Sequence, residues 1–197
     1  MQQDTQDLMA TETSSKNDLD GKQSPNLVHE IMNSQLPPSE KTFRRVFDEV
    51  VTVAGAGFET TASTLRLIFF HIFSNRDILK RLRAEVACAR AQFPREIGLR
   101  ELEQLNYLTS VIMEGLRLSP GVASRLARIS DRELRYRGWQ IPASTPVGMT
   151  VVLLHTDETL YPEPRRFDPS RWLDTGKRSH NAFAPFSRGT RICLGMQ

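Results

Sequence analysis

The C-terminal stretch Phe186-Ser187-Arg188-Gly189-Thr190-Arg191-Ile192-Cys193-Leu194-Gly195 places a lone cysteine between two glycines and close to two arginines. Glycine lets the backbone turn tightly, and exposed amides together with arginine side chains stabilise a thiolate. This setting is typical of a reactive or metal-ligating sulfur. The other cysteine, Cys88, lies near the end of an expected helix, where we expect a small buried or half-buried apolar side chain. The stretch therefore predicts that Cys193 carries chemistry.

A second pattern, Ala56-Gly57-Phe58-Glu59-Thr60-Thr61, lies in the middle of an expected long helix. Glycine and unsatisfied polar groups both cost stability inside a buried helix, so a helix that accepts both has a reason for them. One interpretation is that small residues leave room for a ligand, while the carboxylate and hydroxyl groups relay protons from water. The alternative is close helix packing with satisfied polar groups.

Two weaker patterns lie between this helix and the cysteine. Glu114-x-x-Arg117 puts an acid and a base on one helix face, where they can pair. Phe167-x-Pro169-x-Arg171-Trp172 offers an aromatic anchor, a fixed turn and a guanidinium. We expect Arg171 to bond bidentately to Glu114 while Arg117 holds the other side, which would lock a loop to a helix.

In this order, the four patterns resemble the cytochrome P450 superfamily of haem-thiolate monooxygenases. The haem-ligand loop of that family reads Phe-x-x-Gly-x-Arg-x-Cys-x-Gly, and all five fixed positions occur between Phe186 and Gly195. The stretches Leu118-Ser-Pro-Gly-Val-Ala-Ser-Arg125 and Gly148-Met-Thr150 further resemble fungal secondary-metabolism members.

The resemblance implies a role for each matching residue. Cys193 is the expected axial ligand to haem iron, and Glu59 with Thr60 is the expected catalytic acid–alcohol pair. The remaining expected haem contacts are two propionate arginines, a further arginine candidate, an aromatic beside the thiolate and a loop glycine: Arg191 and Arg128, Arg125, Phe186 and Gly189. Glu114, Arg117 and Arg171 resemble the structural triad that supports the loop.

The resemblance also implies the partners. It implies haem b (iron protoporphyrin IX), electrons from an NADPH–cytochrome P450 reductase with cytochrome b5 as a further donor, and an apolar small-molecule substrate. A thiolate ligand favours O–O cleavage, so one oxygen atom of O₂ would enter the substrate. The expected location of a full-length parent is the cytoplasmic face of the endoplasmic reticulum membrane, held by an anchor. The present chain shows no anchor or signal and would be cytoplasmic.

The expected fold is mainly α with small β-sheets (α+β), a partial cytochrome P450 fold from the long distal helix to the cysteine loop. Residues 1–25 are polar and read as a disordered lead-in, followed by a single partial domain over 26–197 without the anchor, the substrate-capping helices or a C-terminal helix. Family members are typically more than twice as long.

Helices are expected over 26–33, over 40–73 with Ser39 as N-cap, from Asn75 or Asp77 to about Ala91, over 100–104 and over 107–118. We expect Leu65 to Phe73 deep inside the fold because they are apolar almost all round. Short strands are expected over 134–136 and 150–154, with a turn at Gly138 leading into another, followed by a meander from Tyr161 to Pro185.

The composition argues against two other classes, nucleic-acid-binding proteins and zinc proteins. The net charge is +3 with no dense basic block, which argues against a nucleic-acid partner. Four scattered histidines and two distant cysteines give no zinc-ligand spacing. Two hypotheses remain: a piece of an active monooxygenase, or a truncated remnant that is inactive, whether or not it binds haem.

Overall fold

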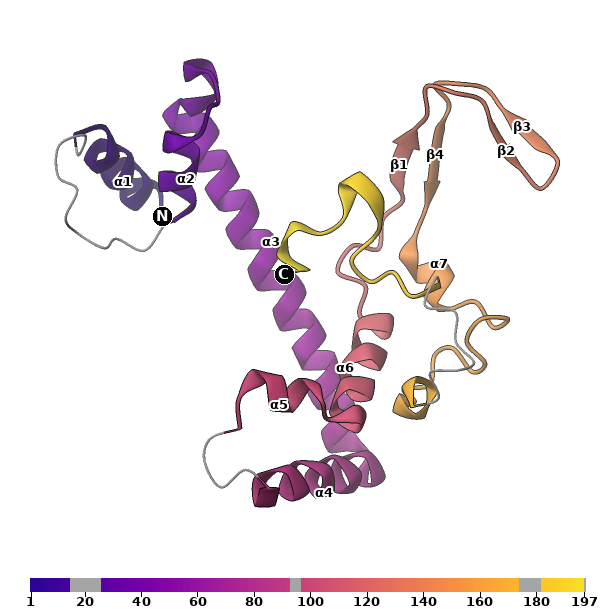
Figure 1. Cartoon of the computed structure of the whole chain (residues 1–197). Helices are drawn as coiled ribbons and strands as arrows, with labels where there is room; N and C mark the ends of the chain where they lie inside the picture. Colours follow the sequence, from indigo (N-terminus) through magenta and orange to yellow (C-terminus); the bar gives the residue numbers. More distant parts are fainter. Residues whose placement is uncertain (15–25, 93–96, 174–181, 197) are drawn as a thin grey trace. The chain divides into compact units, whose positions relative to one another are not determined.

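The computed structural model describes residues 1–14, 26–92, 97–173 and 182–196. The chain forms two compact units, residues 1–59 and residues 60–197. The boundary between them falls inside the longest helix. Figure 1 shows the course of the chain. The boundary expected between residues 25 and 26 lies at the edge of the described residues and stays a prediction.

The first unit is helical. It contains α1 (Gln2–Ser14), α2 (Leu27–Asn33), the 3₁₀ helix η1 (Pro38–Lys41) and the beginning of α3 (Phe43–Ser74). The Asn26 side chain caps α2 by accepting from the His29 amide at 2.9 Å. At the other end of α2, the Lys41 ammonium donates to the carbonyls of Met32 (2.9 Å) and Ser34 (2.6 Å), which have no partner inside the helix.

Two expectations for this unit were wrong. Helix α1 occupies part of the expected disordered lead-in and packs against α2. Its sequence has few apolar residues, so it leaves no amphipathic pattern to detect. Ser39 lies inside η1 and does not cap α3, which begins at Phe43. The remaining lead-in residues, 15–25, lie outside the described residues.

The second unit continues with the rest of α3, then α4 (Arg76–Gln92), α5 (Leu99–Glu103) and α6 (Asn106–Leu118). The expected helices 75–91, 100–104 and 107–118 are confirmed to within one or two residues. Asn75 caps α4, because its side chain accepts from the amides of Asp77 (3.0 Å) and Ile78 (3.2 Å).

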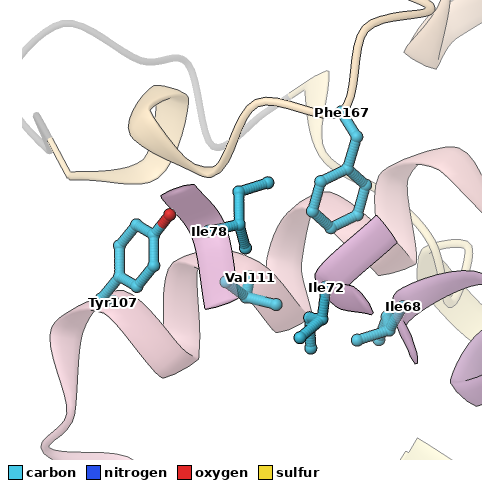
Figure 2. Close-up of a cluster of buried hydrophobic side chains, with 6 residues drawn as sticks. All are labelled: Ile68, Ile72, Ile78, Tyr107, Val111 and Phe167. Atoms are coloured by element: carbon cyan, nitrogen blue, oxygen red, sulfur yellow. The ribbon is translucent and has the colours of Figure 1, made fainter. Parts of the chain in front are cut away.

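An apolar cluster holds α3, α4 and α6 together, as Figure 2 shows. Its buried members come from the three helices and from the meander: Ile68, Ile72, Ile78, Tyr107, Val111 and Phe167. The helices approach closely at Gly115, where an added Cβ would lie 2.1 Å from Cγ1 of Ile68. Glycine is therefore required at this position on α6.

The expectation for the end of α3 was wrong in part. Ile68 and Ile72 are buried, but Leu65, Phe69, Phe70 and Phe73 are exposed, so the helix buries one stripe rather than its whole circumference. Cys88 is also exposed, contrary to expectation.

Among the described residues, the β structure consists of two antiparallel pairs, β1 (Leu126–Ile129) with β4 (Pro146–Met149), and β2 (Leu134–Tyr136) with β3 (Trp139–Ile141). The expected strand at 134–136 and the turn at Gly138 are confirmed. Arg137 and Gly138 both have positive φ, 46° and 84°, as a two-residue hairpin turn requires.

The expected strand at 150–154 was wrong. Residues Val151–His155 form helix α7, and the strand ends before it. The Thr150 hydroxyl caps this helix by accepting from the Val152 amide at 3.2 Å. A run of four apolar residues is too short for its spacing to distinguish a strand from a helix, so the Thr150 cap decides in favour of the helix. After α7 come the 3₁₀ helices η2 (Pro169–Trp172), η4 (Gly189–Arg191) and η5 (Leu194–Met196).

Candidate functional site: a buried carboxylate cluster and the cysteine loop

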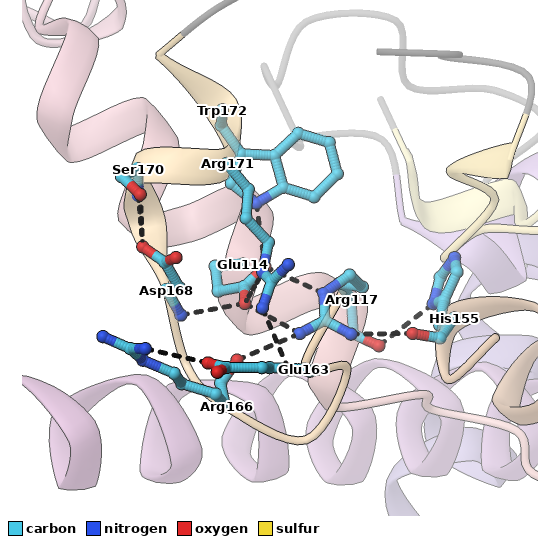
Figure 3. Close-up of polar contacts among 9 residues, drawn as sticks. All are labelled: Glu114, Arg117, His155, Glu163, Arg166, Asp168, Ser170, Arg171 and Trp172. Atoms are coloured by element: carbon cyan, nitrogen blue, oxygen red, sulfur yellow. Dashed lines mark hydrogen bonds and ion pairs between the residues drawn. The ribbon is translucent and has the colours of Figure 1, made fainter. Parts of the chain in front are cut away.

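The Glu114 carboxylate on α6 is fully buried and accepts five hydrogen bonds, which Figure 3 shows in part. Two come from Arg117, to Oε2 at 2.8 Å and to Oε1 at 2.7 Å. The other three come from residues of the meander. They are the Asp168 amide at 2.9 Å, Arg171 Nε at 3.3 Å and the Trp172 indole at 2.9 Å. Buried charge is tolerated only when it is paired and hydrogen-bonded, and this carboxylate meets both conditions.

The structure thus brings Glu114, Arg117 and Arg171 together, but the two arginines exchange their expected parts. Arg117 makes the bidentate pair with Glu114, and Arg171 donates once to it and once, through Nη2, to the Glu163 carbonyl at 2.9 Å. The short three-residue spacing on one helix gives Arg117 the favourable geometry.

Arg117 also reaches beyond the carboxylate. Its Nη1 donates to the His155 carbonyl at 2.7 Å and its Nη2 to the Arg166 carbonyl at 3.3 Å. The guanidinium lies over the ring of Tyr161, 5.0 Å from the centroid. The cluster therefore fastens α6 to α7 and to the meander between Glu163 and Trp172.

Sequence reasoning missed His155. It is buried at the end of α7, and its ring stacks on Phe183 with centroids 5.8 Å apart. Its Nε2 accepts from the Ala184 amide at 3.1 Å. The available signal was a single histidine closing an apolar run, Val151 to Leu154, which is also typical of an ordinary core residue.

The cysteine loop is closed by its own backbone. The Cys193 amide donates to the Phe186 carbonyl at 2.9 Å, and the Ile192 amide donates to the Gly189 carbonyl at 3.0 Å. Ser187 and Gly189 have positive φ, 63° and 75°. Phe186 is half-buried, whereas the Cys193 side chain is exposed and makes no disulfide.

Three arginines were predicted to meet an anionic cofactor, and the structure places all of them at the surface. Arg128 on β1 donates from Nη2 to the Ser187 hydroxyl at 3.3 Å, which links this strand to the cysteine loop. Arg125 precedes β1, and Arg191 lies in η4 within the loop itself.

Glu59 and Thr60 are consecutive on α3 and fall on either side of the division between the two units. Within the second unit, Thr60 lies beside the turn after α6, since an added Cβ on Gly121 would be 3.1 Å from Cγ2 of Thr60. Thr64, one turn further on, donates to the Ser119 hydroxyl at 3.2 Å.

Two groups near the cluster have shifted pKa values. Burial lowers the pKa of His155 below 6.5; the hydrogen bond with the Arg117 carbonyl opposes this, and the Arg117 charge adds to it. Burial raises the pKa of Asp168, but hydrogen bonds from Ser170 and the charges of Arg171 and Arg166 together bring it below 3.8. The cluster thus favours a neutral His155 imidazole and an ionised Asp168 carboxylate.

The cytochrome P450 family model matches residues 2–197. The chain belongs to the cytochrome P450 family. Among the curated P450 relatives, the tryptophan 6-hydroxylase fscE of Fusarium equiseti is 46% identical over 172 residues, which are 84% of this chain and 33% of the relative. The P450 monooxygenase tndB of Aspergillus flavipes is 45% identical, over 85% of this chain and 35% of the relative. The fusicoccadiene C-8 hydroxylase of Phomopsis amygdali is 41% identical, over 87% and 33%.

Solved P450 structures share the fold. The retinoic acid bound cyanobacterial CYP120A1 has a TM-score of 0.73 and 25% identity, covering 97% of this chain and 44% of that one. The expected partial P450 fold, mainly α with small β-sheets, is therefore confirmed. The chain spans about a third of the length of the curated relatives it matches. Within the described ranges, no helix combines the length and apolarity needed to cross a membrane.

Family membership implies a haem cofactor, and the residues present suit one. In the part of the chain that the structure describes, no three His, Cys, Asp or Glu side chains gather as a metal site. Haem brings its own ring nitrogens, so it needs only one axial protein ligand, which an exposed thiol can supply. An added Cβ on Gly195 would lie 3.9 Å from the Cys193 sulfur, so glycine leaves that side of the sulfur open.

Proposed function

We propose that this chain forms the cysteine-loop part of a haem-dependent monooxygenase, in which the Cys193 sulfur would hold the iron of haem b. The observation that carries the proposal is the exposed thiol on a loop closed by the Cys193–Phe186 backbone bond. That loop follows a segment bonded through Ala184 to His155, beside the buried carboxylate cluster. A rigid support suits a ligand that must hold one position.

Each residue would contribute a distinct task. Cys193 would supply the sulfur ligand, on a loop held by the Cys193–Phe186 and Ile192–Gly189 backbone hydrogen bonds. Arg125, Arg128 and Arg191 supply positive charge for the haem carboxylates, Phe186 packs beside the sulfur, and Gly189 allows the turn. A thiolate-ligated haem supplies the activation of O₂. Glu59 and Thr60 on α3 hold and pass protons from water by way of a carboxylate and a hydroxyl.

The overall reaction inserts one oxygen atom of O₂ into a C–H bond of an apolar substrate and releases the other atom as water. A pair of electrons comes from an NADPH–cytochrome P450 reductase, with cytochrome b5 as a further donor, and a pair of protons comes from solvent. The relatives named for tryptophan 6- and fusicoccadiene C-8 hydroxylation support hydroxylation as the reaction class. We place a full-length parent at the cytoplasmic face of the endoplasmic reticulum membrane.

The test is a carbon monoxide difference spectrum of the reduced chain after expression with haem. We expect a strongly red-shifted Soret band that Cys193→Ala abolishes. Cys88→Ala is the matched control, because Cys88 is also free and exposed. It should leave the band unchanged.

The second candidate is a protein that does not catalyse the reaction, whether or not it binds haem. The exposure of an apolar side chain in the cysteine loop favours it, since Leu194 beside the cysteine is 93% exposed. A site open to water neither excludes solvent nor holds an apolar substrate. No haem uptake, or only the band of a neutral-ligand haem, would support this candidate and contradict the first.

A further inference from the structure

His155 is the point at which the carboxylate cluster meets the segment leading to the cysteine loop. Each of its ring nitrogens has a backbone partner, and the two partners belong to different parts of the chain. Nδ1 lies 3.0 Å from the Arg117 carbonyl at the end of α6, and Nε2 lies 3.1 Å from the Ala184 amide. The Arg117–His155 side of this link is visible in Figure 3.

These partners fix the protonation of the ring. A carbonyl only accepts, so Nδ1 must carry the proton that it shares with Arg117. A backbone amide only donates, so Nε2 must be unprotonated to receive Ala184. The imidazole is therefore neutral in its Nδ1–H tautomer, and an added proton would break the bond to Ala184.

Both ends of the link are themselves held. The Arg117 side chain donates in return to the His155 carbonyl at 2.7 Å, so two hydrogen bonds join these residues. On the other side, the Phe183 ring stacks on His155 and meets Trp172 edge to face, with centroids 4.7 Å apart. The Ala184 carbonyl then accepts from the Ser187 amide at 3.1 Å, at the entrance to the cysteine loop.

We infer that His155 is a positioning residue for the cysteine loop, holding Ala184 at a fixed place relative to Arg117 through its neutral Nδ1–H ring. The inference rests on the proposed function only for the role of Cys193. The link itself is a property of the polypeptide and can be tested without haem.

The first test uses the full chain, labelled with ¹⁵N and free of haem. We expect the ring nitrogen resonances of His155 to show a protonated Nδ1 and an unprotonated Nε2 near neutral pH, and the Ala184 amide to exchange slowly with solvent. An Nε2–H tautomer, or an Ala184 amide that exchanges as fast as an open loop, would overturn the inference.

Three substitutions of His155 test its hydrogen bond with Ala184 separately from its hydrogen bond with Arg117. His155→Gln places an amide oxygen near the Nε2 position, where it can accept from Ala184. His155→Asn reaches only the Nδ1 position, and His155→Phe keeps the ring on Phe183 without either bond. We expect hydrogen exchange over residues 184–193 to be about tenfold faster in the Phe and Asn variants than in the Gln variant. Equal rates in all three would contradict the inference.

His71→Phe is the matched control, since His71 also lies in this unit and stacks on an aromatic ring, that of Phe167, with centroids 4.4 Å apart. It should leave exchange over 184–193 unchanged; acceleration equal to that of His155→Phe would reduce His155 to a general packing residue.

A haem-loaded comparison then separates the two proposals. We expect the red-shifted carbon monoxide band in the wild type and His155→Gln, and its partial replacement by a neutral-ligand band in His155→Phe. No such band in the wild type would end the proposed function, while the haem-free tests still decide the role of His155. The same band in the wild type and His155→Phe, with equal exchange, would end the inference and leave the proposed function standing.

Discussion

At the residue scale, Glu114 organises the second unit because one buried carboxylate accepts hydrogen bonds from two segments of the chain. Its partners are the side chain of Arg117 on its own helix and three groups between Asp168 and Trp172. Both members of the Glu114–Arg117 pair are fully buried, so each depends on the other for its charge to be tolerated.

Glu114→Gln should lower the free energy of unfolding by about 3–5 kcal/mol, because it leaves the buried Arg117 guanidinium without a counter-charge. Urea denaturation followed by circular dichroism measures the loss. Glu163→Gln is the matched control: it removes the same charge from an exposed pair with Arg166. It should change stability little. A loss of less than about 1 kcal/mol in Glu114→Gln would show that the cluster does not hold the fold.

A second residue-scale prediction concerns His71. Burial lowers the pKa of His71 below its ordinary value of 6.5, although the Glu114 charge opposes the shift. Between the folded and the unfolded pKa of His71, the unfolded chain binds more protons than the folded chain. The free energy of unfolding is therefore unaffected by this histidine above about pH 6.5 and falls as the pH drops below that value.

Unfolding measured from about pH 7 to about pH 5 should therefore show decreasing stability, with at most about 1.4 kcal/mol per pH unit from each of His71 and His155, because burial lowers both pKa values. His71→Phe keeps a ring on Phe167 and should make the slope shallower. The lowered pKa of Asp168 acts below 3.8, outside this window. An identical slope in His71→Phe would contradict the assignment.

At the element scale, helix α6 begins without a cap of its own, because Leu105 offers no side-chain acceptor. The cap comes from α4: Glu85 Oε1 accepts from the Tyr107 amide and Oε2 from the Leu108 amide, both at 2.8 Å. The negative charge also suits the positive end of the helix dipole.

Glu85→Ala should reduce stability by about 1–2 kcal/mol, because two helix-terminal amides lose their acceptor. Glu85→Gln keeps one acceptor oxygen and should cost less. Thermal unfolding monitored by circular dichroism compares them, with Glu103→Ala as an exposed glutamate control. If the Glu85 and Glu103 variants behaved alike, α6 would not depend on this cap.

At the scale of the whole molecule, the second unit leaves much apolar surface in water. On α3, Phe69, Phe70 and Phe73 are 52%, 65% and 66% exposed, next to Leu65. An apolar face of this kind favours association with other apolar surfaces.

We expect the chain to associate with rising concentration, as sedimentation velocity would show. Phe70→Lys combined with Phe73→Lys should weaken association without lowering the free energy of unfolding, because neither ring belongs to the buried cluster. Replacing the buried Ile72 with Ala should instead lower stability by about 2–5 kcal/mol. Association unchanged in the lysine variant would place the contact surface elsewhere.

The sequence by itself determined the family and most of the helices, and it singled out Cys193 as the predicted ligand. These features depend on short-range rules. A glycine-flanked cysteine motif and apolar spacing along a helix are complete within a few consecutive residues. The spacing of Glu114 and Arg117 likewise predicted their pairing from helix geometry alone. The roles of Glu59, Thr60 and the surface arginines remain proposals from resemblance.

Only the tertiary structure decided which groups complete the site. Glu85 and Tyr107 are 22 residues apart, and His155 and Ala184 are 29 apart, so no local pattern joins them. The same holds for Arg171, which is 57 residues from Glu114, and for the exposed face of α3, since both depend on which elements pack together. Packing is a property of the folded chain, because each contact requires two distant segments to meet.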